Sequence, residues 1–437
     1  MDTAPLPLFS FDRNELQRLQ SALPADLQLL RLRLRFGLPV RVQLGQRFRV
    51  VVDIVDEVGQ PFPKHFAPPE GVDIALTSGD SGNQESGSMD SDDLTLEIEE
   101  QVSPAAADRQ TKWLFWASVQ GSTSSVIDAC VSLSIMMKQT AALGGDPTMN
   151  DHRRLLLQTF CVGSAWLNER VLVLPLQVQL QVTNARDSSA SSLTSTFCQR
   201  LFRSTPSKVS ATGRPTDEGG LLIVEEHYGD AMGAHVWDAS ILLSWAMLHA
   251  STRAPTSPGQ ADPADSNQTM LELGSGCGLF AAVLARFQCS HQHVKAVFTE
   301  KPECTGRLQK NLDRNGSPPS ASVLALEWGT PLPSPLRGAN VRVVFAADVL
   351  YNWAAHEVFL DTLDQLAESD AKLEVLVAHK RRGKASAERL DALASDTFDP
   401  AAHCVISSDK AGCRWTQWRV DKLASLGRVD LFQLSRR

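Results

Sequence analysis

Apolar and polar residues alternate with a period of two along much of the first half of the chain. At residues 30–36 leucine and phenylalanine alternate with arginine, and at residues 177–182 valine and leucine alternate with glutamine. This alternation predicts β-strands with one apolar face. Similar strand-like runs lie at residues 48–55, 72–76, 113–119, 130–137, 155–162 and 171–182. Short strands separated by Gly- and Pro-containing turns predict an all-β domain of the immunoglobulin-like sandwich type.

The second half has a different pattern, in which apolar runs alternate with segments of helical periodicity. Strands are expected at residues 269–273, 294–300, 323–326, 341–347 and 373–379. Strands that alternate with helices predict a parallel sheet covered by helices on both faces. Two last strands, at residues 404–406 and 429–434, have no long helix between them. We therefore expect a hairpin at the end of an otherwise parallel α/β sheet.

Polar and small residues mark the boundaries between these regions. Residues 1–24 are expected to be a flexible or amphipathic lead-in, and residues 186–220, rich in Ser, Thr and Pro, a linker. Residues 79–101 contain eight acidic residues and no Lys or Arg, which predicts a disordered acidic insertion. This leaves a β-rich domain at residues 25–185 and an α/β domain at residues 221–437.

Composition narrows the possible partners. The 437 residues are 43% hydrophobic and 21% charged, with a net charge of −8, as in a globular protein with little general attraction for nucleic acid. The eight cysteines form no C-x-x-C pair and show no metal-ligand spacing, which favours reduced thiols and no metal site. We find no signal peptide and no uninterrupted apolar span of membrane length. A cytoplasmic or nuclear protein is expected, and its oligomeric state is not determined.

A glycine-rich turn follows the first strand of the α/β region. The sequence Leu271-Glu272-Leu273 leads into Gly274, Gly276 and Gly278, and a helix-forming segment begins at once. Strand, turn and helix in this order are typical of nucleotide-binding units, because glycine permits positive φ and close approach of a ligand to the backbone. The G-x-G-x-G spacing differs from the G-x-G-x-x-G of dinucleotide binders. By itself the motif also fits an ordinary tight loop.

Acidic residues stand at or beside the carboxyl ends of three predicted strands, where ligands bind in open α/β sheets. They are Glu272, Glu300 and Asp348. Glu300 follows Gly274 at roughly the interval at which an acid meets ribose hydroxyls, although a helix N-cap is the alternative. Trp328 follows the third strand and offers a face for an adenine, or else packs in the core.

Three other groups of residues have competing interpretations. Arg31, Arg33 and Arg35 are expected on a solvated strand face rather than in a basic binding stripe. Trp113 and Trp116 are expected to pack in a core rather than line a groove. Residues 379–382, His-Lys-Arg-Arg, either contact an acidic peptide or cap the end of the sheet, and we favour the second interpretation.

Taken together, the motifs of residues 222–435 resemble the seven-stranded S-adenosylmethionine-dependent methyltransferases, and more narrowly methyltransferase family 16. The matching segments are Gly233-Ala234-His235-Val236-Trp237-Asp238-Ala239, Leu271 to Gly278, Thr299-Glu300, Leu326-Glu327-Trp328-Gly329 and Asp348-Val349-Leu350-Tyr351. Many members of that family methylate protein lysines. The resemblance implies a Rossmann-like seven-stranded methyltransferase sheet and S-adenosylmethionine as cofactor.

The resemblance also assigns roles to individual residues. Trp237 is expected beside the methionine part of the cofactor, and Glu300 at its ribose. Glu272, Gly274, Gly276 and Gly278 are expected to shape the methionine and ribose pocket. Trp328 is expected beside the adenine, and Asp348 and Tyr351 at the entrance for the acceptor.

We therefore expect a protein-lysine methyltransferase whose β-rich domain helps to select the protein target. Two alternatives stay open, a methyltransferase of a small molecule and an inactive binding protein with a methyltransferase fold. A nicotinamide-dependent oxidoreductase is disfavoured by the glycine spacing. A nucleic-acid amino-methyltransferase is disfavoured because Asp348-Val349-Leu350-Tyr351 replaces the expected Asn/Asp-Pro-Pro-Tyr/Phe.

Overall fold

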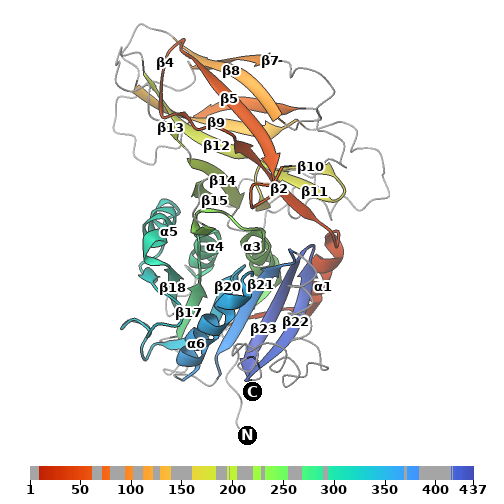
Figure 1. Ribbon diagram of the computed structural model, residues 1–437, viewed down its shortest axis with the longest axis vertical. Coiled ribbons are helices and arrows are strands. Elements are labelled where there is room, and N and C mark those ends of the chain that lie inside the picture. Colours follow the sequence, from red (N-terminus) through yellow and green to blue (C-terminus); the bar gives the residue numbers. More distant parts are fainter. Residues whose placement is uncertain are drawn as a thin grey trace. The chain divides into compact units, whose positions relative to one another are not determined.

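The computed structural model divides the chain into two compact units, each described here by itself (Figure 1). One unit comprises residues 28–202 and 223–230, and the other residues 1–27, 203–222 and 231–437. The structure describes residues 9–61, 71–78, 94–101, 112–121, 128–138, 160–183, 194–195, 197–203, 220–227, 232–253, 268–288, 294–368, 372–382, 415 and 417–437.

The first unit contains two six-stranded sheets. One has the order β10-β11-β2-β5-β8-β7, from β10 (Ala165–Asn168), β11 (Val171–Leu174), β2 (Gln28–Leu34), β5 (Arg47–Val55), β8 (Lys112–Gln120) and β7 (Thr95–Gln101). The other has the order β15-β14-β12-β9-β6, from β15 (Leu221–His227), β14 (Phe197–Arg203), β12 (Leu176–Thr183), β9 (Asp128–Met137) and β6 (Val72–Ser78), with β4 (Arg41–Gln43) paired to β12. Short strands β3 (Leu38–Pro39) and β13 (Thr194–Ser195) form a separate pair.

Alternate residues of these strands form one apolar core, because successive side chains of a strand point to opposite faces. Leu32, Val50 and Val52 of one sheet and Leu133 and Leu180 of the other are fully buried in it. Trp113 packs against this core, as expected. The same prediction is wrong for Trp116, whose ring lies under the Arg47 guanidinium at 5.3 Å and lines a surface pocket. Of the strand predicted at residues 155–162, the part before residue 160 lies outside the described residues, as do residues 79–93 of the predicted acidic insertion.

Two other predictions for this unit are wrong in part. Arg31 is only 1% exposed, and Arg33 forms a double hydrogen bond with Asp53 at 2.9 and 3.1 Å, so the solvated face is wrong for these two residues. Arg35 is exposed, as expected. Part of the predicted linker is a strand, β14, which is held by a buried ion pair between Arg200 and Glu226 at 2.6 Å. The prediction of a linker rested on the many Ser and Thr residues of this region, and it overlooked the ion pair that one buried arginine, Arg200, forms there. The rest of the linker, apart from β13 and residue 220, lies outside the described residues.

The second unit is built on a seven-stranded mixed sheet of order β19-β18-β17-β20-β21-β23-β22. Five strands are parallel, namely β17 (Gln268–Leu273), β18 (Val294–Glu300), β19 (Ala321–Ala325), β20 (Asn340–Ala347) and β21 (Glu374–Lys380). The last two, β22 (Trp418–Leu426) and β23 (Val429–Arg436), form an antiparallel hairpin that joins the sheet through β23. The predicted hairpin is confirmed, but its first strand is β22, and residues 404–406 lie outside the described residues.

Helices alternate with the parallel strands, as predicted, except between β19 and β20, where the described residues form turns. The helices are α3 (Asp238–Ala250), α4 (Leu279–Gln288), α5 (Pro302–Arg314) and α6 (His356–Ala367), with the 3-10 turns η4 (Met232–Ala234) and η6 (Trp353–Ala355). Every residue of β17 is buried, which fits a central parallel strand covered on both faces. The chain passes from β17 to β18 on one side and later to β20 on the other. The carboxyl end of β17 is therefore the topological switch point, where ligands bind in such sheets.

The predicted flexible lead-in is wrong for residues 9–22. Phe9–Phe11 form β1, which pairs with β16 (Ser251–Arg253), and Arg13–Ala22 form the helix α1. The Asp12 carboxylate accepts from the Asn14 and Glu15 N–H groups as an N-cap. Leu16 and Leu19 of α1 are fully buried, and α1 lies beside β22 (Figure 1), where the Ser425 N–H donates to the Gln20 side chain at 2.9 Å. Two buried leucines at helical spacing are too weak a pattern to predict this packing.

Gly427, in the turn between β22 and β23, provides a test of this packing. Its φ is +60°, and an added Cβ would lie 2.7 Å from the Leu27 Cβ. We expect Gly427→Ala to lower the free energy of unfolding by about 2–4 kcal/mol, from left-handed strain and steric overlap together. Gly338→Ala is the matched control, since φ is +74° there and nothing lies within 4 Å of the added Cβ. Equal losses in urea denaturation of the two variants would contradict the packing against Leu27.

Candidate functional site

The glycine-rich turn leaves the carboxyl end of β17 in a conformation that requires glycine. Gly274, Gly276 and Gly278 have φ values of +71°, +57° and +88°. A Cβ on Gly278 would lie 2.6 Å from Leu308, whereas one on Gly276 would meet only the carbonyl oxygens of Gly233 and His235, at 3.8 and 3.9 Å. Gly278 is therefore needed for packing of the helix α5, and Gly274 for the close approach of the Val349 and Trp328 side chains, whereas no side chain lies within 4 Å of the Cβ position of Gly276.

Glu300, the last residue of β18, reaches across to this turn. Its Oε2 accepts from the Gly276 N–H at 2.7 Å and its Oε1 from the Lys301 N–H at 2.9 Å. The alternative role as N-cap is not what the structure has, because the N-cap of α5 is Lys301. Each carboxylate oxygen can accept a second hydrogen bond. Glu300 is thus fixed beside the turn with capacity for further donors.

Glu272 lies beneath the same turn and is 1% exposed. Burial raises its pKa to about 8, and the Glu300 carboxylate adds to the rise, while the nearby Ser275 hydroxyl opposes it. The Ser275 hydroxyl lies outside hydrogen-bonding geometry, and among the described residues the Glu272 Oε2 atom has no hydrogen-bond partner. A buried polar atom without a partner is costly, and such atoms occur where a ligand supplies the missing contact.

The segment η4 and the residues after it pack against the turn from the other side. The Cys277 thiol contacts the His235 carbonyl oxygen at 3.1 Å, and an added Cβ on Gly233 would lie 3.7 Å from the carboxyl carbon of Glu300. Trp237 begins α3, and its indole N–H donates to the Met232 carbonyl at 3.1 Å. The glycine turn, Glu300 and the segment that carries Trp237 therefore lie together at the carboxyl end of β17.

Trp328 follows β19 and is half-buried. Its ring would lie 3.2 Å from a Cβ on Gly274, and it packs edge-on against Phe359 of α6 with ring centroids 5.4 Å apart. The ring therefore packs on the core through one edge, as one of the two interpretations expected, and another part of it lies beside the glycine turn. The neighbouring Glu327 is exposed.

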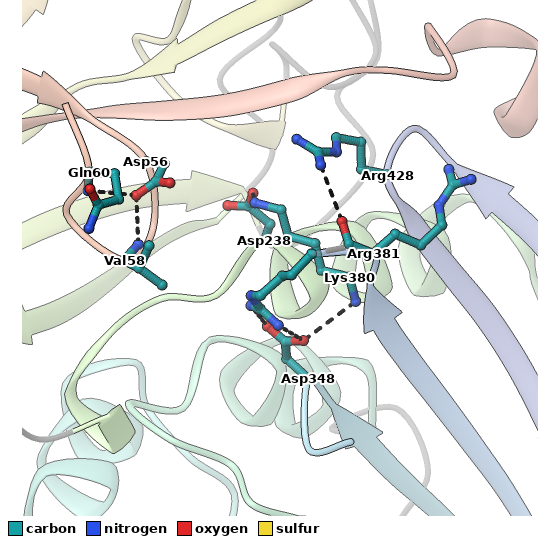
Figure 2. A network of polar contacts seen from close by, with 9 residues as sticks. Asp56, Val58, Gln60, Asp238, Asp348, Lys380, Arg381 and Arg428 are labelled. Atoms are coloured by element: carbon teal, nitrogen blue, oxygen red, sulfur yellow. Dashed lines mark hydrogen bonds and ion pairs between the residues drawn. The ribbon is translucent and has the colours of Figure 1, made fainter. Parts of the chain in front are cut away.

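Asp348 directly follows β20 and has the one positive φ, +61°, found for a non-glycine residue in the described part of the chain. Its carboxylate is 2% exposed and forms a bidentate ion pair with Arg382, with 2.7 Å between Nη1 and Oδ1. The Lys380 N–H donates to the same Oδ1 at 3.4 Å (Figure 2). Tyr351, the other residue expected at the acceptor entrance, is 48% exposed.

Sequence reasoning missed the pairing of Asp348 with Arg382. Both interpretations offered for residues 379–382, contact with an acidic peptide and capping of the sheet, overlooked this partner. The N-cap of α3 is Trp237, and the carboxylate of the next residue, Asp238, forms an ion pair with Lys380. The available signal was a pair of cations two positions apart, Lys380 directly after a predicted strand and Arg382 just beyond it.

His379 lies next to this group and is 1% exposed. Burial and the Arg382 guanidinium lower its pKa to about 4, against the opposing effect of Asp430, so the imidazole is neutral at physiological pH. Among the described residues, no group of His, Cys, Asp and Glu side chains is arranged to hold a metal ion. No helix of the described part of the chain is long and apolar enough to cross a membrane.

The sequence has detectable relatives. Residues 216–396 match the family model described as lysine methyltransferase. Over 144 residues the chain is 30% identical to the protein-lysine methyltransferase METTL21E of Mus musculus, covering 32% of this chain and 53% of that protein. Over 174 residues it is 29% identical to the protein-lysine N-methyltransferase EFM6 of Saccharomyces cerevisiae, covering 38% of this chain and 70% of that protein.

Both alignments cover part of each protein, and the chain spans about half the length of most of the curated relatives it matches. Among solved structures, the mitomycin 7-O-methyltransferase MmcR is 16% identical, with a TM-score of 0.28 over 40% of this chain and 51% of that chain. A likeness at that TM-score carries no argument about this protein.

Glu272 gives a pH-dependent test of the site. Because its pKa rises from 4.5 to about 8 on folding, the unfolded chain ionises first, and stability falls as the pH rises between these values. Glu272→Gln removes this loss. We expect the variant to be similar to wild type at pH 5 and more stable by on the order of 4 kcal/mol at pH 9. Urea denaturation across this range measures the difference. Exposed Glu327→Gln is the control, and a pH-independent difference for Glu272→Gln would contradict the assignment.

Proposed function

We propose that this protein, whose residues 216–396 match the family model described as lysine methyltransferase, transfers methyl groups from S-adenosylmethionine to lysine side chains of a protein substrate. The observation that carries the proposal is the convergence of the positive-φ glycine turn, the Glu300 carboxylate and η4 at the carboxyl end of β17. Nucleotide-like ligands bind at this point of open α/β sheets.

The residues at this place fit the cofactor. Glu300 would accept hydrogen bonds from the two ribose hydroxyls, and Gly276, whose added Cβ would meet no atom nearer than 3.8 Å, would let the ligand approach the backbone. Gly274 would shape the same pocket by letting Trp328 approach the turn. The buried Glu272 Oε2, which lacks a protein partner among the described residues, would receive a donor from the ligand. Trp328 would flank the adenine and Trp237 the methionine end. Gly278 supports this pocket through its packing on Leu308.

When bound, S-adenosylmethionine supplies a methyl group that is already activated by its sulfonium. The protein residues then have to orient and desolvate the acceptor. The lysine amine must lose its proton to solvent before its lone pair forms the N–C bond as the C–S bond breaks. Desolvation lowers the pKa of an incoming lysine, whereas a carboxylate beside it raises the pKa, so the lysine would arrive as an ammonium and lose its proton to solvent before transfer. We assign Asp348 and Tyr351 to the entrance for the acceptor, where Asp348 orients the amine and Tyr351 packs along its stem.

Finer assignments belong to the same proposal. We place the methyltransferase unit at residues 221–437, as a Rossmann-like seven-stranded methyltransferase fold, and an immunoglobulin-like β-rich unit at residues 25–185. The β-rich unit would help to select the protein target. We expect the protein in the cytoplasm, and also in the nucleus, where protein acceptors of this kind occur.

Cofactor binding tests the first step. We expect Glu300→Ala to weaken S-adenosylmethionine binding by about 10- to 100-fold, because two hydrogen bonds from the ribose to a charged acceptor are lost. Isothermal titration calorimetry measures this loss. Glu303→Ala is the matched control, since Glu303 is an exposed acid in the first turn of α5. Absence of binding by the wild-type protein would favour an inactive scaffold instead.

The acceptor is tested by incubation with methyl-labelled cofactor and cell lysate. We expect label in protein, recovered as methyl-lysine after acid hydrolysis, and a loss of at least roughly tenfold in Asp348→Ala, because the acceptor loses its orienting carboxylate. Cofactor affinity of this variant is measured in parallel, so that a loss of cofactor binding is recognised. Label confined to the small-molecule fraction would overturn the lysine assignment in favour of a small-molecule acceptor.

A further inference from the structure

The entrance to the proposed acceptor site is occupied by a positive charge of the protein itself. The Arg382 guanidinium pairs with both oxygens of Asp348, and its central carbon lies 5.4 Å from the centroid of the Trp237 ring. A carboxylate on one side and an aromatic face on another are the two features that proteins use to bind organic cations. We propose that Asp348 and Trp237 form a cation-binding site for the acceptor lysine, and that Arg382 fills this site until the acceptor displaces it.

The two walls of this site are held in place independently of Arg382. The Asp348 N–H donates to the Ala378 carbonyl at 2.7 Å, which ties the residue to the end of β21 in spite of its left-handed backbone. The Trp237 ring is fixed by its hydrogen bond to the Met232 carbonyl and by edge-on contact with His235, whose ring centroid is 5.8 Å away. The site is therefore preorganised for a cation, whichever residue supplies the charge.

Arg382 is the exchangeable part of the arrangement. It lies two residues beyond the last residue of β21, and its side chain is 28% exposed, whereas that of Asp348 is 2% exposed. Lys380, the nearest other cation on this strand, pairs its ammonium with Asp238 and gives Asp348 a backbone N–H (Figure 2). Arg382 is thus the more exposed partner of this ion pair, and its guanidinium is the group that an incoming cation would replace.

Electrostatics favours an exchange of cations over simple removal of Arg382. A buried carboxylate that loses its partner is strongly destabilised, whereas replacement of a guanidinium by an ammonium keeps it paired. A neutral or acidic group has no comparable means of displacing Arg382. The arrangement therefore selects cationic side chains at the entrance, and it keeps the carboxylate neutralised when no acceptor is present. The identity of the cation as lysine rests on the function proposed above, but the existence of the site does not.

The test uses small cations as probes of the full-length protein. In Arg382→Ala, we expect methylguanidinium and butylammonium, the second a mimic of the lysine side chain, each to raise the melting temperature by about 2–4 °C at roughly ten times Kd. Sodium chloride at equal ionic strength corrects for salt. Wild type, Arg381→Ala and the double variant Asp348→Asn/Arg382→Ala are expected not to respond. Arg381 is the matched control because its guanidinium faces Asp430 instead, at 3.4 Å.

Several results would overturn the inference. One such result is that methylguanidinium stabilises Arg382→Ala and butylammonium does not. The ion pair of Asp348 would then be a structural pair specific for arginine, and the site would not accept lysine. An equal response of Arg381→Ala, or of the double variant, would show that the cations act elsewhere. If Arg382→Ala does not fold, refolding in the presence of each cation replaces the melting experiment. Rescue by butylammonium then supports the site, and failure of both cations to rescue contradicts it.

Methyl transfer provides a second measurement. With labelled cofactor and serially diluted lysate, Arg382→Ala is expected to reach half-maximal labelling at a several-fold lower lysate concentration than wild type, with a similar maximal rate. A purely structural role for Arg382 would lower the maximal rate instead. If wild type labels no acceptor at all, the proposed function is wrong, while the melting experiment still decides whether the cation site exists.

Discussion

The hydrogen bond between the Glu300 carboxylate and the Gly276 N–H is the contact on which the candidate site depends. This hydrogen bond, 2.7 Å long, joins the glycine turn that follows β17 to the end of β18, and so it sets the position of that turn. The turn forms because three glycines accept positive φ, and the third also makes room for Leu308. The backbone of η4 lies beside Gly276, because a Cβ on Gly276 would be 3.8 Å from the Gly233 carbonyl oxygen. One backbone donor and one carboxylate thus determine where Glu272 and the segment carrying Trp237 can lie.

A second constraint is the pairing of charges at the other edge of the site. Two acids near the carboxyl ends of β20 and β21 are almost fully buried, and each is paired with a cation from the end of β21. Asp430, at the start of β23, is buried in the same way, between Lys422 at 3.2 Å and Arg381 at 3.4 Å, with the Ser425 hydroxyl donating at 2.6 Å. Because a buried charge without a partner is costly, these pairs limit the conformations that the end of β21 can adopt.

The β-rich unit shows the same physics in a structural role. Arg200 and Glu226 are both almost inaccessible to solvent, and the Arg200 side chain also donates to the carbonyl oxygens of Leu32 and Leu174 at 2.9 and 3.3 Å. One arginine therefore joins β14, β15, β2 and β11 of this unit. A buried guanidinium suits this function because its planar fork of five donors can satisfy several acceptors at once. In the other unit, by contrast, Arg382 is partly exposed and so can exchange with a ligand.

The sequence by itself determined the succession of strands and helices, the glycine turn and the positions of Glu272, Glu300 and Asp348 at strand ends. These features are local, since each is set by periodicity or by residues a few positions apart. The tertiary structure decided the rest, including the packing of α1, the strand β14, the burial of Arg31 and the pairing of Asp348 with Arg382. Those outcomes join residues far apart in the chain, such as the 34 positions between Asp348 and Arg382. A charged side chain looks the same in sequence whether it faces water or a buried partner, because desolvation and pairing depend on neighbours that only the folded chain brings together.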